Sequence, residues 1–288
     1  RKMGGLFGKK NLWIAPSLGD WLATGRDVKY MAMHNGPVSN AFIVNDLRIM
    51  VWAASYLGKT DDAEKHAVQL EKTRDAYIKA FVKKDGTMKD DYQRAYVMAL
   101  KMVLPKGELW NKVYHQLVQR LTRDGMQTGF FATEHILPLL ADNGDEKLAF
   151  DLLLDERCGG WMYQVKAGAT TTWERWDAIR PDGTVNETKS NGDNMVSFNH
   201  YSFGSVGKFY YQYILGIQPL EPGFAKIKIR PRIDSRIGAF SGSYKDILVV
   251  YDGKTLHIST PADTQIILPD GTVHEVGAGT YDFSVKEQ

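Results

Sequence analysis

The hydrophobic pattern of this 288-residue chain changes its period near Pro219, and that change limits the folds open to it. From about residue 39 to 155, apolar residues recur every three to four positions, which is typical of amphipathic α-helices. After Pro219 the pattern alternates with period two, which is typical of β-strands. The alternating runs are Ala225–Arg230, Ile247–Tyr251, Thr255–Ser259 and Thr264–Leu268.

Seven helical segments are expected in the first part of the chain. Turn signals follow several of them, at Gly58, Pro105 and Asn143-Gly144. Short turns between long helices indicate antiparallel hairpins, so this part suits a toroid of helical hairpins. Apart from a loop around 156–198, residues 39–215 should be almost wholly helical. The expected helices are Ala41–Leu57, Asp61–Phe81, Tyr92–Val103, Leu109–Leu121, Phe130–Ala141, Lys147–Leu154 and about Asn199–Leu215.

Hairpin signals follow in the second part. Asp252-Gly253 and Asp270-Gly271 each stand between or beside alternating runs, as the tight turns of antiparallel strands do. The sequence therefore predicts a mainly α chain with a C-terminal all-β domain. We expect residues 1–218 to belong to the helical part and residues 219–288 to a small antiparallel β-sandwich.

Composition narrows the functions open to the chain. The net charge of +2 and the pI of 8.4 are too weak to favour nucleic acid or an anionic membrane as a partner. No apolar stretch approaches the ~20 residues that cross a bilayer. The single cysteine, Cys158, can form no intrachain disulfide, and it leaves the compartment open.

The amino end has basic residues but no apolar core after them, so it is not expected to be a signal peptide. Cytoplasmic, periplasmic and secreted locations all stay open, as does the oligomeric state. Because position 1 is Arg1 and not Met, the sequence is expected to be a fragment. No metal and no cofactor are expected, since six of the histidines show no metal-ligand spacing: His34, His66, His115, His135, His257 and His274.

Two motifs carry the chemistry. In the run Gly168-Ala-Thr-Thr-Thr-Trp-Glu-Arg-Trp176, the carboxylate of Glu174 stands between the indoles of Trp173 and Trp176. Shortly after comes Ser197-Phe-Asn-His-Tyr-Ser-Phe-Gly204, which contains Asn199 and His200. Indole faces stack on sugar rings, and a carboxylate can deprotonate a water that attacks an anomeric carbon. Together the motifs predict a site that processes carbohydrate.

These motifs, in this order, resemble those of the bacterial α-L-rhamnosidases, family 78 of the glycoside hydrolases. The resemblance also rests on Gly19-Asp20-Trp21-Leu22-Ala23, Thr128-Gly129-Phe130 and the I-R-P-R-I-D segment at 229–234. It covers nearly the entire chain. It implies an (α/α)6 toroid followed by a β-sandwich, and inverting hydrolysis of α-linked L-rhamnose in a glycoside or polysaccharide.

The resemblance also implies roles for single residues. Glu174 would be the general base and His200 a ligand of the bound sugar, with Asn199 beside it. The pocket wall would consist of Trp173, Trp176, Asp20 and Trp21.

One feature of the family is missing. Its general acid lies in a stretch like D-x-x-R-D-E-R-x-G-W, amino-terminal to all these motifs, and no such stretch precedes Asp20. The run Asp155-Glu156-Arg157 echoes it, but its distance to Gly168 fits the helix end that leads into the loop of the base. Seven helices are also fewer than the twelve of a closed toroid of six hairpins. The chain is therefore expected to lack the first part of its own barrel. That missing amino-terminal part would be its structural partner.

Several alternatives stay open. Glu174 could form a structural ion pair with Arg175, and His200 could cap a helix or lie in the core. Asp193 and Asn194 could serve only as turn residues. In place of a hydrolase, the chain could be a non-catalytic carbohydrate-binding remnant. A polysaccharide lyase on a similar toroid would need Tyr and His residues in place of an isolated Glu.

Overall fold

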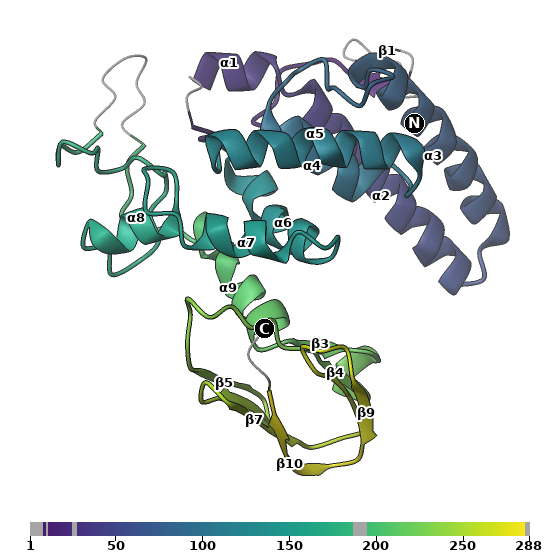
Figure 1. Ribbon diagram of the computed structural model, residues 1–288. Helices are drawn as coiled ribbons and strands as arrows, with labels where there is room; N and C mark the ends of the chain where they lie inside the picture. The colour runs from purple at the N-terminus through teal and green to yellow at the C-terminus, as the bar shows by residue number, and fades with distance from the viewer. Residues whose placement is uncertain (1–7, 10, 25–27, 187–194, 286–288) are drawn as a thin grey trace. The chain divides into compact units, whose positions relative to one another are not determined.

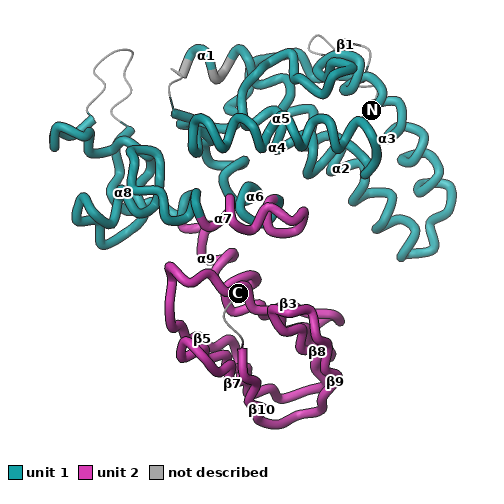
Figure 2. Tube along the Cα trace, viewed as in Figure 1, with its two compact units in different colours: residues 1–139, 151–203 teal, residues 140–150, 204–288 magenta. Residues whose placement is uncertain are grey.

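The computed structural model describes residues 8–9, 11–24, 28–186 and 195–285 of the chain. The two candidate turn residues Asp193 and Asn194 lie outside this part, as does most of the basic amino end. Figure 1 follows the chain from its first helices to its C-terminal strands. The residues group into two compact units, 1–139 with 151–203 and 140–150 with 204–288 (Figure 2). Each unit is described separately.

The first unit begins with a short antiparallel pair, β1 (Gly8–Lys9) and β2 (Leu12–Trp13), followed by α1 (Val28–Met33). Helices α2 (Gly36–Tyr56) and α3 (Thr60–Phe81) form a long hairpin around Gly58, as predicted. The predicted start of α2 was five residues late. Pro37 lies in its first turn, where a proline loses no hydrogen bond and its fixed φ suits the helix.

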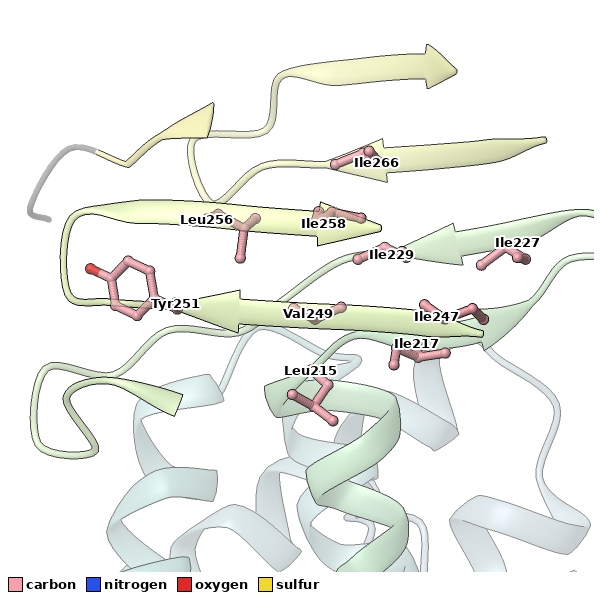
Figure 3. Packing of buried hydrophobic residues seen from close by; sticks show 10 residues of the cluster. All are labelled: Leu215, Ile217, Ile227, Ile229, Ile247, Val249, Tyr251, Leu256, Ile258 and Ile266. Atoms are coloured by element: carbon pink, nitrogen blue, oxygen red, sulfur yellow. The ribbon is translucent and has the colours of Figure 1, made fainter. Parts of the chain in front are cut away.

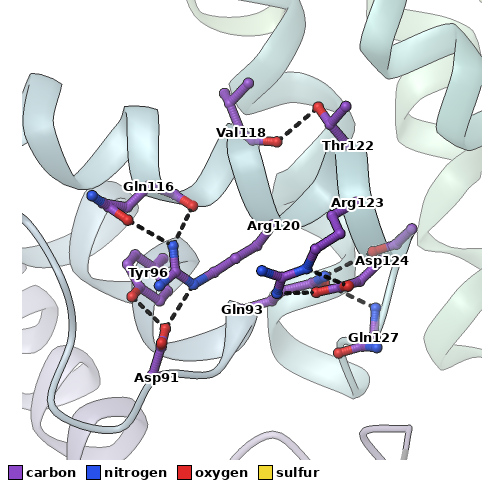
Figure 4. Close-up of polar contacts among 11 residues, drawn as sticks. Asp91, Gln93, Tyr96, Gln116, Val118, Arg120, Thr122, Arg123, Asp124 and Gln127 are labelled. Atoms are coloured by element: carbon purple, nitrogen blue, oxygen red, sulfur yellow. Dashed lines mark hydrogen bonds and ion pairs between the residues drawn. The ribbon is translucent and has the colours of Figure 1, made fainter.

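Helix α4 (Gln93–Met98) continues into a π-helical turn, Ala99–Val103, which stops before Pro105. Helix α5 (Glu108–Asp124) follows, ending at Gly125. Arg120 of α5 donates from Nε to Asp91 Oδ1 at 2.6 Å and lies 4.5 Å from the ring centre of Tyr96 (Figure 4). This hydrogen bond lowers the pKa of Asp91. The contact ties α5 to the segment that enters α4.

Three further helices follow along the chain, α6 (Phe130–Ala141), α7 (Glu146–Leu153) and α8 (Trp161–Lys166). Residues 140–150, which include the end of α6 and most of α7, belong to the second unit. The bounds of α6 are those predicted. Helix α8 was not predicted, since it lies inside the expected loop 156–198. The expected helix from Asn199 to Leu215 is shorter and broken into a 3-10 turn (Ser202–Ser205), α9 (Val206–Phe209) and a π-helical turn (Tyr210–Ile214).

The strands of the second unit form two sheets among the described residues. One has the order β10-β7-β6-β5, built from β5 (Phe240–Tyr244), β6 (Ile247–Tyr251), β7 (Thr255–Thr260) and β10 (Gly279–Ser284). The other has the order β3-β4-β8-β9, built from β3 (Ile217–Pro219), β4 (Ile227–Ile229), β8 (Thr264–Ile267) and β9 (Val273–Val276).

These sheets confirm the predicted change from helices to strands. The predicted antiparallel pattern holds for every described pair except β4 and β8, which run parallel. The apolar face of each strand turns to a shared core, which includes Ile229, Ile247 and Ile258, each 0% exposed (Figure 3). Alternation in the sequence predicts this inward face directly. No helix in the described ranges combines the length and the apolar character that a membrane crossing needs.

Candidate active site

The two sequence motifs lie side by side in the first unit, joined by hydrogen bonds between their main chains. Glu174 N donates to Ser197 O at 2.8 Å, and His200 N donates to Thr172 O at 2.9 Å. The Thr172 hydroxyl in turn donates to His200 O at 2.7 Å. The Thr172 hydroxyl, two residues before Glu174, therefore helps to join the two motifs. The pairing carries the candidate base and the candidate sugar ligand on adjacent segments.

Glu174 is held by one of its two carboxylate oxygens. Oε2 accepts a hydrogen bond from Ser197 N at 2.9 Å. Oε1 has no hydrogen-bond partner in the described part of the chain, and the residue as a whole is 8% exposed. Arg175 pairs with Asp177 at 2.7 Å. A carboxylate with one fixed oxygen and one available oxygen is suited to accept a proton from a bound water.

The indoles on either side of Glu174 are not a sugar platform in this structure, which corrects the role implied for them. Trp173 and Trp176 are 2% and 1% exposed. Trp176 Nε1 donates to Thr128 O at 2.8 Å, and its ring stacks on Phe203 at 3.9 Å between centres. The Trp173 ring meets Phe198 edge-on at 5.6 Å. The two indoles anchor the Glu174 segment in the core.

His200 has a defined ring orientation. Ser202 N donates to its Nδ1 at 3.3 Å, so in the neutral imidazole the proton lies on Nε2. The ring stacks on Phe130 at 4.8 Å and on Tyr201 at 5.0 Å between centres. His200 thus lies between two aromatic rings and keeps an Nε2–H available as a donor. The alternative of a core histidine does not fit, since the residue is only partly buried.

Asp20 and Trp21 reach the same region from the start of the chain, but only Trp21 is partly exposed. Asp20 is 0% exposed, and its two oxygens accept hydrogen bonds from the main-chain N–H groups of Gly129, Phe131 and Ala132 at 2.7–2.9 Å. Burial raises the pKa of Asp20, against the opposing effect of these donors. Asp20 therefore fixes the start of α6, which corrects its expected place in the pocket wall.

Trp21 extends toward the second motif. Its Nε1 lies 3.4 Å from Met195 Sδ, and the indole packs in one apolar cluster with Met195 and Phe130. Since Phe130 stacks on His200, Trp21 and His200 share a neighbour. The motifs also predict that Glu174, Trp173, His200 and Trp21 converge in one concavity at one end of the helical layer, and this stays a prediction.

The start of α4 supports this arrangement through Tyr92, which directly precedes the helix, and Gln93, its first residue. The Tyr92 hydroxyl donates to Gln127 O at 2.8 Å and also contacts Thr24 O. Gln93 bridges the same turn: its Nε2 donates to Gly125 O at 2.7 Å and its Oε1 accepts from Gln127 N at 2.9 Å (Figure 4). Tyr92 and Gln93 therefore both hydrogen-bond to the turn that precedes Phe130.

Two exposed aromatic side chains close to His200 had no role among the residues expected at the site from the sequence. Tyr201 is 83% exposed and Phe198 is 40% exposed, whereas the tryptophans of the motif are buried. Phe198 and Tyr201 thus offer exposed aromatic faces next to His200. Their position directly before and after Asn199-His200 was the available signal. Asn199 is itself exposed, and its N–H lies 3.2 Å from Ser197 Oγ in a local turn.

The run that echoes the acid motif forms local ion pairs. Asp155 pairs with Arg157 at 2.6 Å, and Glu156 pairs with Lys166. Trp161 lies in the core, with its Nε1 donating to Phe203 O at 2.9 Å. These contacts hold the segment in place through its own side chains. They agree with its expected place at the helix end that leads into the loop of Glu174.

The helical hairpins of the first unit and the strands of the second are the elements that the class of six-hairpin glycosidases with a C-terminal β domain would supply. Residues 7–214 match the family model described as the bacterial alpha-L-rhamnosidase 6 hairpin glycosidase domain. The match covers well over half of the chain, so the chain belongs to this family.

One curated protein and two solved structures illustrate the similarity. An α-L-rhamnosidase of Streptomyces avermitilis is 32% identical over 94% of this chain and 28% of its own length. A crystal structure of a Streptomyces avermitilis α-L-rhamnosidase complexed with L-rhamnose has a TM-score of 0.83 at 30% identity, over 97% of this chain and 29% of that one. The α-L-rhamnosidase of Aspergillus terreus has a TM-score of 0.82 at 25% identity, over 98% and 34%. The chain thus spans less than a third of the length of the curated relatives it matches.

Proposed function

We propose that this chain supplies the general base and part of the sugar pocket of an inverting glycoside hydrolase that releases terminal α-linked L-rhamnose. The observation that carries the proposal is the Glu174 carboxylate, fixed through Oε2 by Ser197 N at 2.9 Å and unpartnered at Oε1 among the described residues. The relatives named above, one of them complexed with L-rhamnose, support the choice of sugar.

In this reaction Glu174 Oε1 accepts a proton from a water while the water oxygen bonds to the anomeric carbon. The bond from that carbon to the glycosidic oxygen breaks, and the leaving oxygen takes a proton from a general acid. Attack from the face opposite the leaving group turns the α-linked sugar into β-L-rhamnose. The two carboxyl groups of such an enzyme stand ~6.5–9.5 Å apart, so that the water fits between base and sugar.

The sugar itself would be held by the residues around His200. The Nε2–H of His200 is a suitable donor to a ring hydroxyl, since Nδ1 already accepts from Ser202. Trp21 and Tyr201 offer partly or largely exposed aromatic faces on which the apolar side of a sugar can stack. Asn199, exposed beside His200, would add a polar contact.

We place the general acid on a segment that precedes these motifs in the complete polypeptide, together with the rest of the barrel. Asp155, Glu156 and Asp20 are already engaged, the first two in ion pairs and the third with main-chain N–H groups. The same engagement favours the second candidate, a carbohydrate-binding remnant that keeps a pocket without an acid.

The test is hydrolysis of an aryl α-L-rhamnoside by the complete gene product, followed by NMR of the sugar as it forms. The inverting proposal expects β-L-rhamnose to appear first and the α anomer to follow only by mutarotation. First appearance of the α anomer would refute inversion. Binding of L-rhamnose without any hydrolysis would favour the remnant instead.

A further inference from the structure

Asp20 joins two parts of the first unit that lie 109 to 112 residues apart in sequence. Its Oδ2 accepts from Gly129 N at 2.7 Å, and its Oδ1 accepts from Phe131 N and Ala132 N at 2.8 and 2.9 Å. Phe131 N and Ala132 N lie in the first turn of α6, where N–H groups have no partner within the helix, and Gly129 directly precedes that turn. A buried carboxylate with both oxygens engaged in this way is a rigid connection.

The two segments also touch through their main chains. Phe130 N donates to Trp21 O at 3.1 Å. A Cβ atom added at Gly129 would lie 2.1 Å from Trp21 O and 2.6 Å from Asp20 O, so only glycine allows this approach. The position of the Phe130 backbone is therefore set by the segment that contains Asp20.

The Phe130 side chain transmits that position to the candidate site. Its ring stacks on the imidazole of His200, with 4.8 Å between centres and 29° between planes. It also packs in the cluster that contains Trp21 and Met195. A shift of α6 would therefore move one of the two rings that enclose His200.

We infer that Asp20 is a positioning residue: through Gly129 and Phe130 it sets the orientation in which His200 and Trp21 meet the sugar. The inference rests on the proposed function for its effect on turnover. Its structural part, that the hydrogen bonds of Asp20 to Gly129, Phe131 and Ala132 set the position of Phe130 against His200, concerns the folded chain alone.

The sharpest variant is Asp20→Asn, which keeps the shape and the Oδ1 acceptor but turns one oxygen into an NH2 group. That group would face Gly129 N, donor against donor. In the complete enzyme we expect KM for an aryl α-L-rhamnoside to rise about tenfold, the effect of roughly one lost hydrogen bond to a ligand, with a smaller change in kcat. The acidic limb of the pH profile, which reports the base, should stay where it is.

Phe130→Leu tests the ring contact between Phe130 and His200 and leaves the hydrogen bonds of Asp20 in place. It should raise KM in the same direction, and the double variant should show less than the sum of the two effects, because both act through His200. Val113→Ala is the matched control: it removes methyl groups from a fully buried position on α5 and should lower stability without moving KM.

A readout that needs no turnover separates this inference from the proposed function. In the folded protein, Asp20→Asn and Phe130→Leu should both shift the ring resonances of His200, while Val113→Ala should leave them in place. Unchanged His200 resonances and unchanged KM in Phe130→Leu would overturn the inference, even if Asp20→Asn proved too unstable to study. Absence of rhamnoside hydrolysis with shifted His200 resonances would instead count against the proposed function alone.

Discussion

Glu174 and Ser197 exchange hydrogen bonds in both directions: Glu174 N donates to Ser197 O at 2.8 Å, and Ser197 N donates to Glu174 Oε2 at 2.9 Å. The orientation of the carboxylate thus depends on the segment that also contains His200. The candidate base and the candidate sugar ligand are therefore fixed relative to each other by local pairing. A displacement of either segment should disturb both.

Replacing Glu174 tests its role as base. In the complete enzyme, Glu174→Gln should lower kcat by ~10²–10⁴-fold, the usual contribution of general-base assistance. The loss should be similar for substrates with good and poor leaving groups, because activation of the water does not depend on the leaving group. Steady-state kinetics on a series of aryl rhamnosides measures this.

The control for this variant is Glu64→Gln, at an exposed position of α3 in the same unit, which should retain full turnover. Retention of wild-type kcat by Glu174→Gln would remove Glu174 from the mechanism. A loss confined to poor leaving groups would assign it to protonation of the leaving group instead.

Tyr201 offers a test of the exposed aromatic surface. Its ring is 83% exposed and lies against His200, so Tyr201→Ala should cost little stability and should raise KM several-fold, about the value of one aromatic contact (~0.5–1.5 kcal/mol). Isothermal titration with L-rhamnose and steady-state kinetics report the change. Tyr56→Ala, at an 80% exposed position of α2, is matched in exposure and should leave KM unaltered. An unchanged KM in Tyr201→Ala would show that the ring does not contact substrate.

Trp176 should behave in the opposite way. Trp176→Phe leaves Thr128 O without its indole donor and opens space against Phe203, which should lower the free energy of unfolding by about 1–3 kcal/mol. Urea denaturation followed by circular dichroism measures this loss. A Trp176→Phe protein of wild-type stability that binds L-rhamnose poorly would restore Trp176 to the pocket wall.

The local pattern of the sequence predicted the helices and strands well, because hydrophobic period and turn residues are themselves local. Phe130–Ala141 was predicted to the residue, and the change to strands after Pro219 is confirmed. The parallel pairing of β4 with β8 could not be predicted, since the two strands are separated by other strands and no turn links them. Short helices such as α8 were also missed, since six residues give too little period to detect.

At the site, the residue types in the sequence indicated the kind of chemistry, but the sequence did not show which of these side chains are buried. An indole beside a carboxylate suits either a sugar platform or a core, and only packing decides; Trp176 packs on Phe203 and belongs to the core. The role of Asp20 depends on Gly129, 109 residues away, and no local signal links them. Tyr201 was overlooked because its exposure depends on how the loop folds.

The β part provides a prediction about pH. His257 on β7 is opposite Asp282 on β10, with 2.7 Å from its Nδ1 to Asp282 Oδ1, and its Nε2 lies 3.6 Å from Asp252 Oδ2. The hydrogen bond to Asp282, with a further effect of Asp252, raises the pKa of His257. A raised pKa in the folded state means that the protonated imidazole is stabilised by folding. This contribution is fully present below the unfolded pKa of ~6.5 and is lost as the pH rises through the folded value.

Asp282→Asn should therefore destabilise the β part more at pH ~5.5, below the unfolded pKa of His257, than at an alkaline pH above its raised folded pKa. Thermal unfolding of both proteins across this range gives the difference directly, and high salt should reduce it because the pair is exposed. Asp246→Asn, an exposed carboxylate between β5 and β6, should show no such pH dependence. A difference that grew toward alkaline pH would have the wrong sign for a protonated His257 and would rule out the ion pair as its cause.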